Sequence, residues 1–146
     1  MHLDDVFLMD IVKPGKKVIC RIDINSPLSI DGEILDVTRF REHKDTIRYF
    51  IGNNNGLVLL AHQGRPGKKD FTSLNKHAEI LREILNYDVK FVPDVIGERA
   101  INAIKNMRPG DVILLDNVRL VDDEYVVKSI EEHAKSKIVK LSLIHI

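Results

Sequence analysis

Three short segments of the sequence place arginine, histidine, aspartate and asparagine side chains among glycine and proline residues. The first segment contains Asp23 and Asn25. The second contains His62 and Arg65, and Arg119 belongs to the third. Arginine presents a planar fork of donors that binds carboxylate or phosphate oxygens two at a time, and the aspartate and asparagine can bind a hydroxyl or a second polar group. These residue types together suit a small, doubly anionic, hydroxylated molecule.

Each segment follows a short apolar run that predicts a β-strand. Strands are expected over 17–22, 57–61, 89–92 and 112–115, because these runs are β-branched or leucine-rich and are bounded by turn residues. Both faces of the runs are apolar, which is typical of parallel strands covered on both sides. Ligands bind at the carboxyl ends of parallel strands. We therefore expect the three polar segments to meet at one edge of the sheet.

Amphipathic stretches between the strands predict helices. Apolar side chains recur at helical spacing over 38–52, 73–86, 97–107 and 123–136. Arg39 lies at the start of the first helix, and Thr72 or Ser73 is the expected N-cap of the second. Alternating strands and helices predict a three-layer, Rossmann-like α/β fold, with a parallel sheet and helices on both faces.

Composition narrows the class of protein. The 146 residues carry 22 basic and 22 acidic side chains, and this balance argues against a protein that coats nucleic acid or an anionic membrane. The apolar windows are too short for a membrane span, and no secretory signal is evident, so we expect a cytoplasmic protein. Cys20 is the only cysteine and lies in an apolar run, which indicates a buried thiol.

Each candidate side chain also has a purely structural interpretation. Asp23 could form a turn, and His62 could be a satisfied structural histidine. Arg39 and Arg119 could be solvated surface arginines, and Asn117 could be a simple turn residue. The expected convergence of these residues at one edge of the sheet favours a functional pocket over five unrelated structural roles.

The sequence predicts no metal site. His77, His133 and His145 have no spacing to cysteine or carboxylate that resembles a zinc site. The acidic run 122–124 is interpreted as a helix cap, because acidic residues favour the positive end of the helix dipole. Residues 64–67 read GRPG, which is neither a P-loop nor a dinucleotide fingerprint.

The residues that carry this chemistry resemble motifs of phosphoglycerate kinases. Residues 21–28, RIDINSPL, are similar to the family's R-V-D-F/I-N-x-P segment, and residues 36–40, DVTRF, to its D-x-x-R-I/F helix start. Residues 61–66 resemble its H-x-G-R-P loop, with the glutamine typical of archaeal members, and residues 114–119 resemble its L-L-E-N-x-R strand end. The likeness runs over residues 10–125 in the family's order, so the set of motifs is specific.

This resemblance implies a phosphotransferase of glycolysis and gluconeogenesis. Members of the family transfer a phosphoryl group reversibly between Mg-ATP and the carboxylate of 3-phosphoglycerate. The resemblance implies that Asp23 and Asn25 hold the hydroxyl and carboxyl region, and that Arg39 is catalytic by stabilising charge on the phosphoryl group in flight. By the same resemblance, three side chains grip the 3-phosphate: His62, Arg65 and Arg119. Phosphoryl transfer is largely a matter of positioning and charge neutralisation, so no covalent protein nucleophile is required.

The resemblance also sets expectations about what the chain lacks. The family's N-D-A-F-A-x-A-H-R motif and its nucleotide-binding domain are missing. We therefore expect residues 1–146 to form a single, C-terminally truncated 3-phosphoglycerate-binding domain, which binds no Mg-ATP and is inactive alone. Full-length members are usually monomeric, whereas an unpaired apolar sheet edge predicts that this chain self-associates. Residues 141–146 are either a native helix end or a sequence foreign to the family.

A rival from another class stays open at this point. The same pocket would suit a stand-alone α/β module that binds phosphate-bearing metabolites without catalysis. An N-D-A-F segment and a nucleotide domain following in the reading frame would favour the kinase, and a native stop codon would favour the module.

Overall fold

A computed structural model describes residues 13–121 of the chain. The regular elements in this part of the chain are β1 (Lys17–Arg21), α2 (Thr38–Glu42), α3 (Lys44–Gly52), β2 (Gly56–Leu60), α4 (Asn75–Leu85), β3 (Lys90–Val92), α5 (Glu98–Lys105), β4 (Val112–Leu115) and a 3-10 turn, η1 (Val118–Leu120). The helix predicted over 123–136, the acidic run 122–124 and the tail 141–146 lie outside the described residues. Within residues 13–121, no helix has the length and apolar character needed to cross a membrane.

The four strands form one sheet in the order β1-β2-β4-β3, and all three neighbouring pairs are parallel. The predicted parallel sheet is therefore confirmed. In the register, Arg21 of β1 lies opposite Leu60 of β2, and Leu59 lies opposite Leu114 of β4. The carboxyl ends of β1, β2 and β4 consequently lie next to one another, and the polar segments that follow them begin at a common edge.

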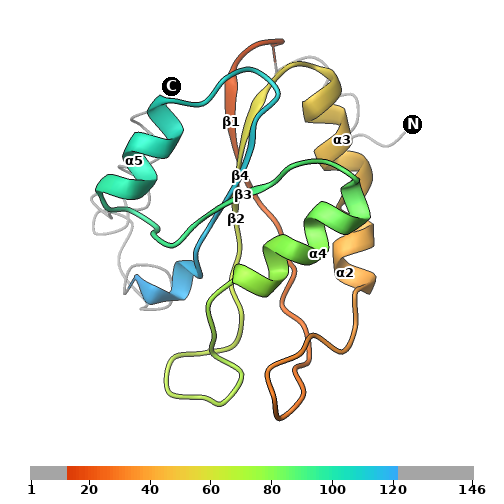
Figure 1. Cartoon of the computed structure of the whole chain (residues 1–146), viewed down its shortest axis with the longest axis vertical. Coiled ribbons are helices and arrows are strands. Elements are labelled where there is room, and N and C mark those ends of the chain that lie inside the picture. The colour runs from red at the N-terminus through yellow and green to blue at the C-terminus, as the bar shows by residue number, and fades with distance from the viewer. Residues whose placement is uncertain (1–12, 122–146) are drawn as a thin grey trace, which may run out of the picture.

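Helices cover both faces of the sheet, which confirms the three-layer arrangement. All five residues of β2 are buried. Leu57 and Leu59 belong to one core with side chains of α2, α3 and α4, whereas Val58 and Leu60 belong to a second core with side chains of α5. Figure 1 shows α2, α3 and α4 on one side of the strands and α5 on the other. Cys20 of β1 is half-buried, less than predicted, and burial raises the pKa of its thiol.

The single helix predicted over 38–52 is wrong, because two helices meet at His43. His43 leaves the α-helical hydrogen-bonding pattern, and its N–H donates to the carbonyl only three residues earlier, at 3.3 Å. Its ring nitrogen Nε2 lies 3.2 Å from the amide nitrogen of Asp23 and 3.1 Å from the carbonyl oxygen of that residue. A contact with a segment twenty residues away thus accompanies the break between the two helices. The spacing of apolar residues over 38–52 does not predict this contact.

The predicted N-cap of α4 is also wrong. Neither Thr72 nor Ser73 caps the helix, and Leu74 occupies the cap position without a capping side chain. The carboxylate of Asp116, at the end of β4, instead accepts hydrogen bonds from the Leu74 N–H at 3.0 Å and the Ser73 hydroxyl at 3.1 Å. The start of α4 is therefore tied to the edge of the sheet where the polar segments lie.

Candidate functional site

Beyond β1 the chain stays extended, and exposed and buried side chains alternate along it. Ile22 and Ile24 are buried, whereas Arg21 and Asp23 are exposed and Asn25 is half-buried. Successive side chains of an extended chain point to opposite faces. Asp23 and Asn25 therefore share a face, as the sequence predicts, and Arg21 shares it with them. The two isoleucines anchor this segment in the core.

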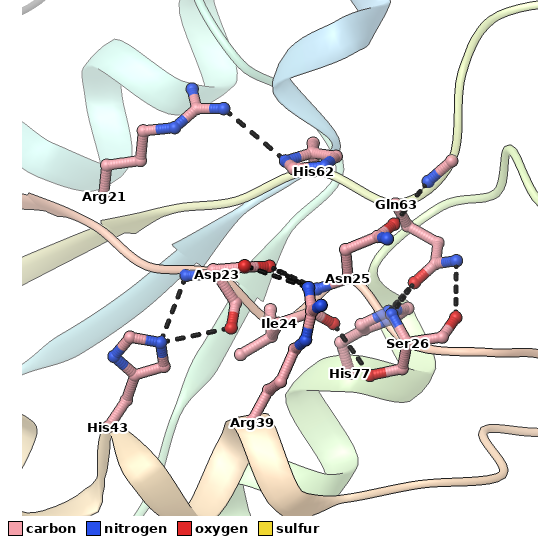
Figure 2. Close-up of polar contacts among 11 residues, drawn as sticks. Arg21, Asp23, Ile24, Asn25, Ser26, Arg39, His43, His62, Gln63 and His77 are labelled. Atoms are coloured by element: carbon pink, nitrogen blue, oxygen red, sulfur yellow. Dashed lines mark hydrogen bonds and ion pairs between the residues drawn. The ribbon is translucent and has the colours of Figure 1, made fainter.

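Arg39 at the start of α2 forms an ion pair with Asp23 (Figure 2). Its Nη1 lies 2.8 and 2.9 Å from the two carboxylate oxygens of Asp23. Burial raises the pKa of Asp23, but the Asn25 N–H and the Arg39 guanidinium outweigh it and hold this pKa below its ordinary value. Both side chains are about half exposed, so the pair is worth at most about 1 kcal/mol. An incoming anion can compete for Arg39 at little energetic cost.

Gly64 is the point at which the three predicted segments meet. Its N–H donates to Oδ1 of Asn25 at 2.8 Å, and its carbonyl accepts from Nη1 of Arg119 at 2.9 Å. Gly64 has a φ of +67°, and a Cβ atom there would lie 2.5 Å from the backbone of Asp70. A glycine is therefore needed both for the backbone conformation and for the close approach. One residue thus joins the loops that follow β1, β2 and β4.

Asn117 locks the loop after β4 against the loop after β2. It is fully buried, and its Nδ2 donates to the carbonyls of Gln63 at 2.8 Å and Thr72 at 2.9 Å. Its Oδ1 accepts from the N–H of Arg119 at 3.1 Å. Asn117 is therefore more than a simple turn residue. It fixes the backbone from which Arg119 reaches Gly64.

The two remaining predicted site residues, His62 and Arg65, lie at the same edge. His62 is half-buried, and its Nδ1 lies 3.5 Å from Nη2 of Arg21 (Figure 2). Arg65 is exposed and directly follows Gly64, whose carbonyl binds Arg119. Arg65 and Arg119 consequently belong to one rim. Contacts join four of the six predicted site residues, since Asp23 binds Arg39 and the Asn25 N–H, and Asn25 and Arg119 both bind Gly64. His62 and Arg65 lie in the same loop as Gly64 and complete the predicted set at this edge.

Sequence reasoning missed several residues that support this edge. Arg21 shares the face of Asp23 and contacts His62, and the alternation of the extended segment could have indicated it. His43 binds the backbone of Asp23 and had no such signal. Gln63 and His77 are buried and hydrogen-bonded to each other at 2.9 Å. A buried amide in a glycine-rich loop cannot be recognised from its neighbours in the sequence.

The charges at this edge favour an anionic ligand. Four guanidinium groups belong to it, those of Arg21, Arg39, Arg65 and Arg119. In the described part of the chain, three carboxylates near these arginines are already engaged: Asp23 binds Arg39, Asp36 accepts two hydrogen bonds from Thr38, and Asp116 accepts N–H and hydroxyl donors at the start of α4. Within residues 13–121, no three histidine, cysteine, aspartate or glutamate side chains are grouped so that they could hold a metal ion. The arrangement can bind a small acid by charge and by directed hydrogen bonds.

Comparisons with known proteins all point to one family. The family model for phosphoglycerate kinase matches residues 8–144. The chain is 46% identical over 131 residues to a phosphoglycerate kinase of Saccharolobus solfataricus, an alignment that covers 90% of this chain and 32% of the relative. It is 44% identical over 133 residues to the phosphoglycerate kinase of Archaeoglobus fulgidus, and this alignment covers 91% of this chain and 32% of the relative. The chain thus spans about a third of the length of the curated relatives it matches.

Solved structures of phosphoglycerate kinases also resemble this chain. The crystal structure of phosphoglycerate kinase from Pyrococcus horikoshii matches with a TM-score of 0.90 and 37% identity, covering 95% of this chain and 34% of that one. Phosphoglycerate kinase from Coxiella burnetii matches with a TM-score of 0.60 and 29% identity, covering 76% and 28%. The parallel sheet, the rim of loops at its edge and the sequence motifs all fall within residues 8–144, which the family model matches, and the chain belongs to the phosphoglycerate kinase family.

Proposed function

We propose that this chain supplies the 3-phosphoglycerate-binding side of a phosphoglycerate kinase, with residues 1–146 forming one substrate domain. Membership of the family supports the reaction, in which a phosphoryl group passes between ATP and the carboxylate of 3-phosphoglycerate. The observation that carries the proposal is the junction at Gly64, which binds Asn25 from one loop and Arg119 from another. That junction brings Asn25 and Arg119, from distant parts of the sequence, to the residue that precedes Arg65.

The 3-phosphate is held by His62, Arg65 and Arg119 in this proposal. Arg119 presents one guanidinium nitrogen to the Gly64 carbonyl, and its Nε is buried with no hydrogen-bond partner among the described residues. A buried donor without a partner carries a free-energy cost that an acceptor would relieve. Phosphate oxygens supply such acceptors, and Arg65 and His62 can reach the same group from the neighbouring loop.

The hydroxyl and carboxylate of the acid lie against Asp23, Asn25 and Arg39 in this proposal. Asp23 is held ionised by Arg39 and by the Asn25 N–H, so it can accept a hydrogen bond from a hydroxyl. The exposed ion pair leaves Arg39 free to turn toward the substrate carboxylate, where it can stabilise the negative charge on the oxygens of the phosphoryl group in flight. These residues bind, orient and neutralise the acid, which is the main requirement of phosphoryl transfer.

Nucleotide and Mg²⁺ belong to the reaction as the phosphoryl donor. The described residues offer neither a cluster of metal ligands nor a phosphate-cradling glycine motif of the P-loop kind. A polypeptide consisting of residues 1–146 is expected to bind 3-phosphoglycerate and to transfer no phosphoryl group.

Calorimetric titration with 3-phosphoglycerate tests this proposal. We expect Arg65→Ala to weaken binding by about tenfold or more, because a charge-assisted hydrogen bond contributes about 1.5–3 kcal/mol. Arg108→Ala is the matched control: it removes the same charge from an exposed arginine just before β4, at the opposite end of that strand. Equal affinities of wild type and Arg65→Ala would refute the pocket assignment.

A further inference from the structure

The side chain of Gln63 lies at the centre of the three loops and is fully buried. Its Oε1 accepts the Ser26 N–H at 3.0 Å, and its Nε2 donates to the Ser26 carbonyl at 2.9 Å (Figure 2). The backbone carbonyl of Gln63 accepts from Asn117, which belongs to the loop after β4. One residue of the second loop thus binds the first loop through its side chain and the third loop through its backbone.

His77 of α4 holds the Gln63 amide in one orientation. Its Nε2 lies 2.9 Å from Oε1 of Gln63, the same oxygen that accepts the Ser26 N–H. Because a carbonyl oxygen only accepts, the imidazole must carry a hydrogen on Nε2. Burial lowers the pKa of His77 to about 4, although the nearby Asp116 carboxylate opposes this, so the ring is neutral near neutral pH. A neutral donor of fixed tautomer therefore keeps the amide from flipping.

Gln63 and Ser26 continue the hydrogen-bonding pattern between β1 and β2 beyond the point where the backbone bonds of these strands end. The backbone register of β1 and β2 stops at Arg21 and Leu60, with one further bond from the Ile22 N–H to the Leu60 carbonyl at 2.9 Å. Beyond that point, the amide of Gln63 bonds to both the N–H and the carbonyl of Ser26, as a neighbouring strand would. These two bonds set the separation of the loops at which Asn25 can reach the Gly64 N–H.

We propose that Gln63, oriented by His77, is a positioning residue that holds the loops after β1 and β2 at the spacing needed to bind the substrate anion. This inference rests on the proposed function, because the anion in question is 3-phosphoglycerate. Neither side chain touches the ligand. Both act through the junction at Gly64, from which Asn25, Arg65 and Arg119 are placed.

The test compares Gln63→Met, which keeps the length of the side chain and removes its hydrogen bonds, with wild-type protein. Amide hydrogen exchange of Gly64 reports the loop spacing, and calorimetry reports affinity for 3-phosphoglycerate. We expect Gln63→Met to speed Gly64 exchange and to weaken binding, each by about tenfold, the loss expected for one or two buried hydrogen bonds. Amides of the sheet core, at Val58 and Leu114, should keep their protection.

A conservative pair at His77 separates positioning from general stability. His77→Gln retains a donor near Oε1 of Gln63, whereas His77→Phe retains the ring volume and removes the donor. We expect His77→Gln to bind 3-phosphoglycerate more tightly than His77→Phe under conditions where both are folded. Gly64 exchange that stays slow in Gln63→Met, or equal binding by the two His77 variants, would overturn this inference alone. A wild-type protein that does not bind 3-phosphoglycerate would overturn the proposed function.

Discussion

Mild acid should destabilise the fold through His77. The side chain is 1% exposed, and its ring lies 5.7 Å from that of Phe40, centroid to centroid. Nε2 binds Gln63, whereas Nδ1 is buried and has no hydrogen-bond partner among the described residues. Protonation of Nδ1 would place an unpaired N–H and a positive charge in this interior. Among residues 13–121, the Asp116 carboxylate is the charged group that partly offsets this cost.

The magnitude follows from the two pKa values of His77. In the unfolded chain the imidazole has its ordinary pKa of 6.5, whereas in the folded protein this pKa is lowered to about 4. Between these values the unfolded state binds a proton that the folded state does not, so the free energy of unfolding falls as the pH falls. At about 1.36 kcal/mol per pH unit, the gap corresponds to about 3 kcal/mol. This stability is fully present above pH 6.5 and is lost as the pH falls to about 4.

Urea unfolding at several pH values between 6.5 and 4 measures this loss directly. His77→Phe is the control, because it keeps an aromatic ring against Phe40 and cannot titrate. We expect the variant to lose about 1 kcal/mol at neutral pH, since the hydrogen bond to Gln63 is gone, and to depend less on pH than wild type in this window. Carboxylates that do not interact with His77, such as Asp23, contribute the same pH dependence to both proteins. Identical pH dependence of the two proteins would refute the reasoning.

Two substitutions, each with a control variant, test the contacts that hold the rim together. Gly64→Ala would bring a Cβ within 2.5 Å of the Asp70 backbone, so we expect it to abolish 3-phosphoglycerate binding by calorimetry. Gly67 also has a positive φ, but a Cβ atom added there would have nothing within 4 Å. Gly67→Ala should therefore lower the free energy of unfolding by only about 1 kcal/mol and should still bind 3-phosphoglycerate. Equal losses of binding in the two alanine variants would contradict the role of the contact between Gly64 and Asp70. Asp116→Ala should lower the free energy of unfolding by about 1–3 kcal/mol, because the Ser73 hydroxyl and the Leu74 N–H lose their acceptor. Asp116→Asn retains an accepting oxygen and should lose less; a loss as large as that of the alanine variant would contradict this capping role.

The sequence was sufficient for the sheet and for the edge at which the site lies. Short apolar runs bounded by turn residues predicted all four strands, because a strand buried on both faces needs apolar residues at every position, as in β2. Parallel strands share a carboxyl edge, so the polar segments after 17–22, 57–61 and 112–115 could be placed together before any contact was known. Arg119 and Asn25 indeed meet at Gly64.

The contacts that shape the site could not be predicted, because they join residues far apart in the chain. The break at His43 accompanies a contact with the Asp23 backbone, which the local periodicity of 38–52 does not contain. The start of α4 is capped by Asp116 from 42 residues away, where local rules pointed to Thr72 or Ser73. Gln63 looked like a loop residue, yet it is fully buried and binds Ser26.

A cavity away from the rim offers an internal reference for ligand-binding experiments. It has a volume of about 260 Å³ and is lined in part by Tyr87, Asn106 and Val112. Val112 is the first residue of β4, so this cavity lies toward the amino ends of the strands, opposite the proposed site. Ligand contact there would leave the Gly64 junction untouched.

Amide chemical shifts during a 3-phosphoglycerate titration test the central claim most directly. If loops from three strand ends bind one small acid together, the amides of Asn25, Gly64 and Arg119 should shift along a single binding curve, while those of Tyr87 and Asn106 stay unchanged. Shifts confined to one loop, or centred on Tyr87 and Asn106, would contradict the account.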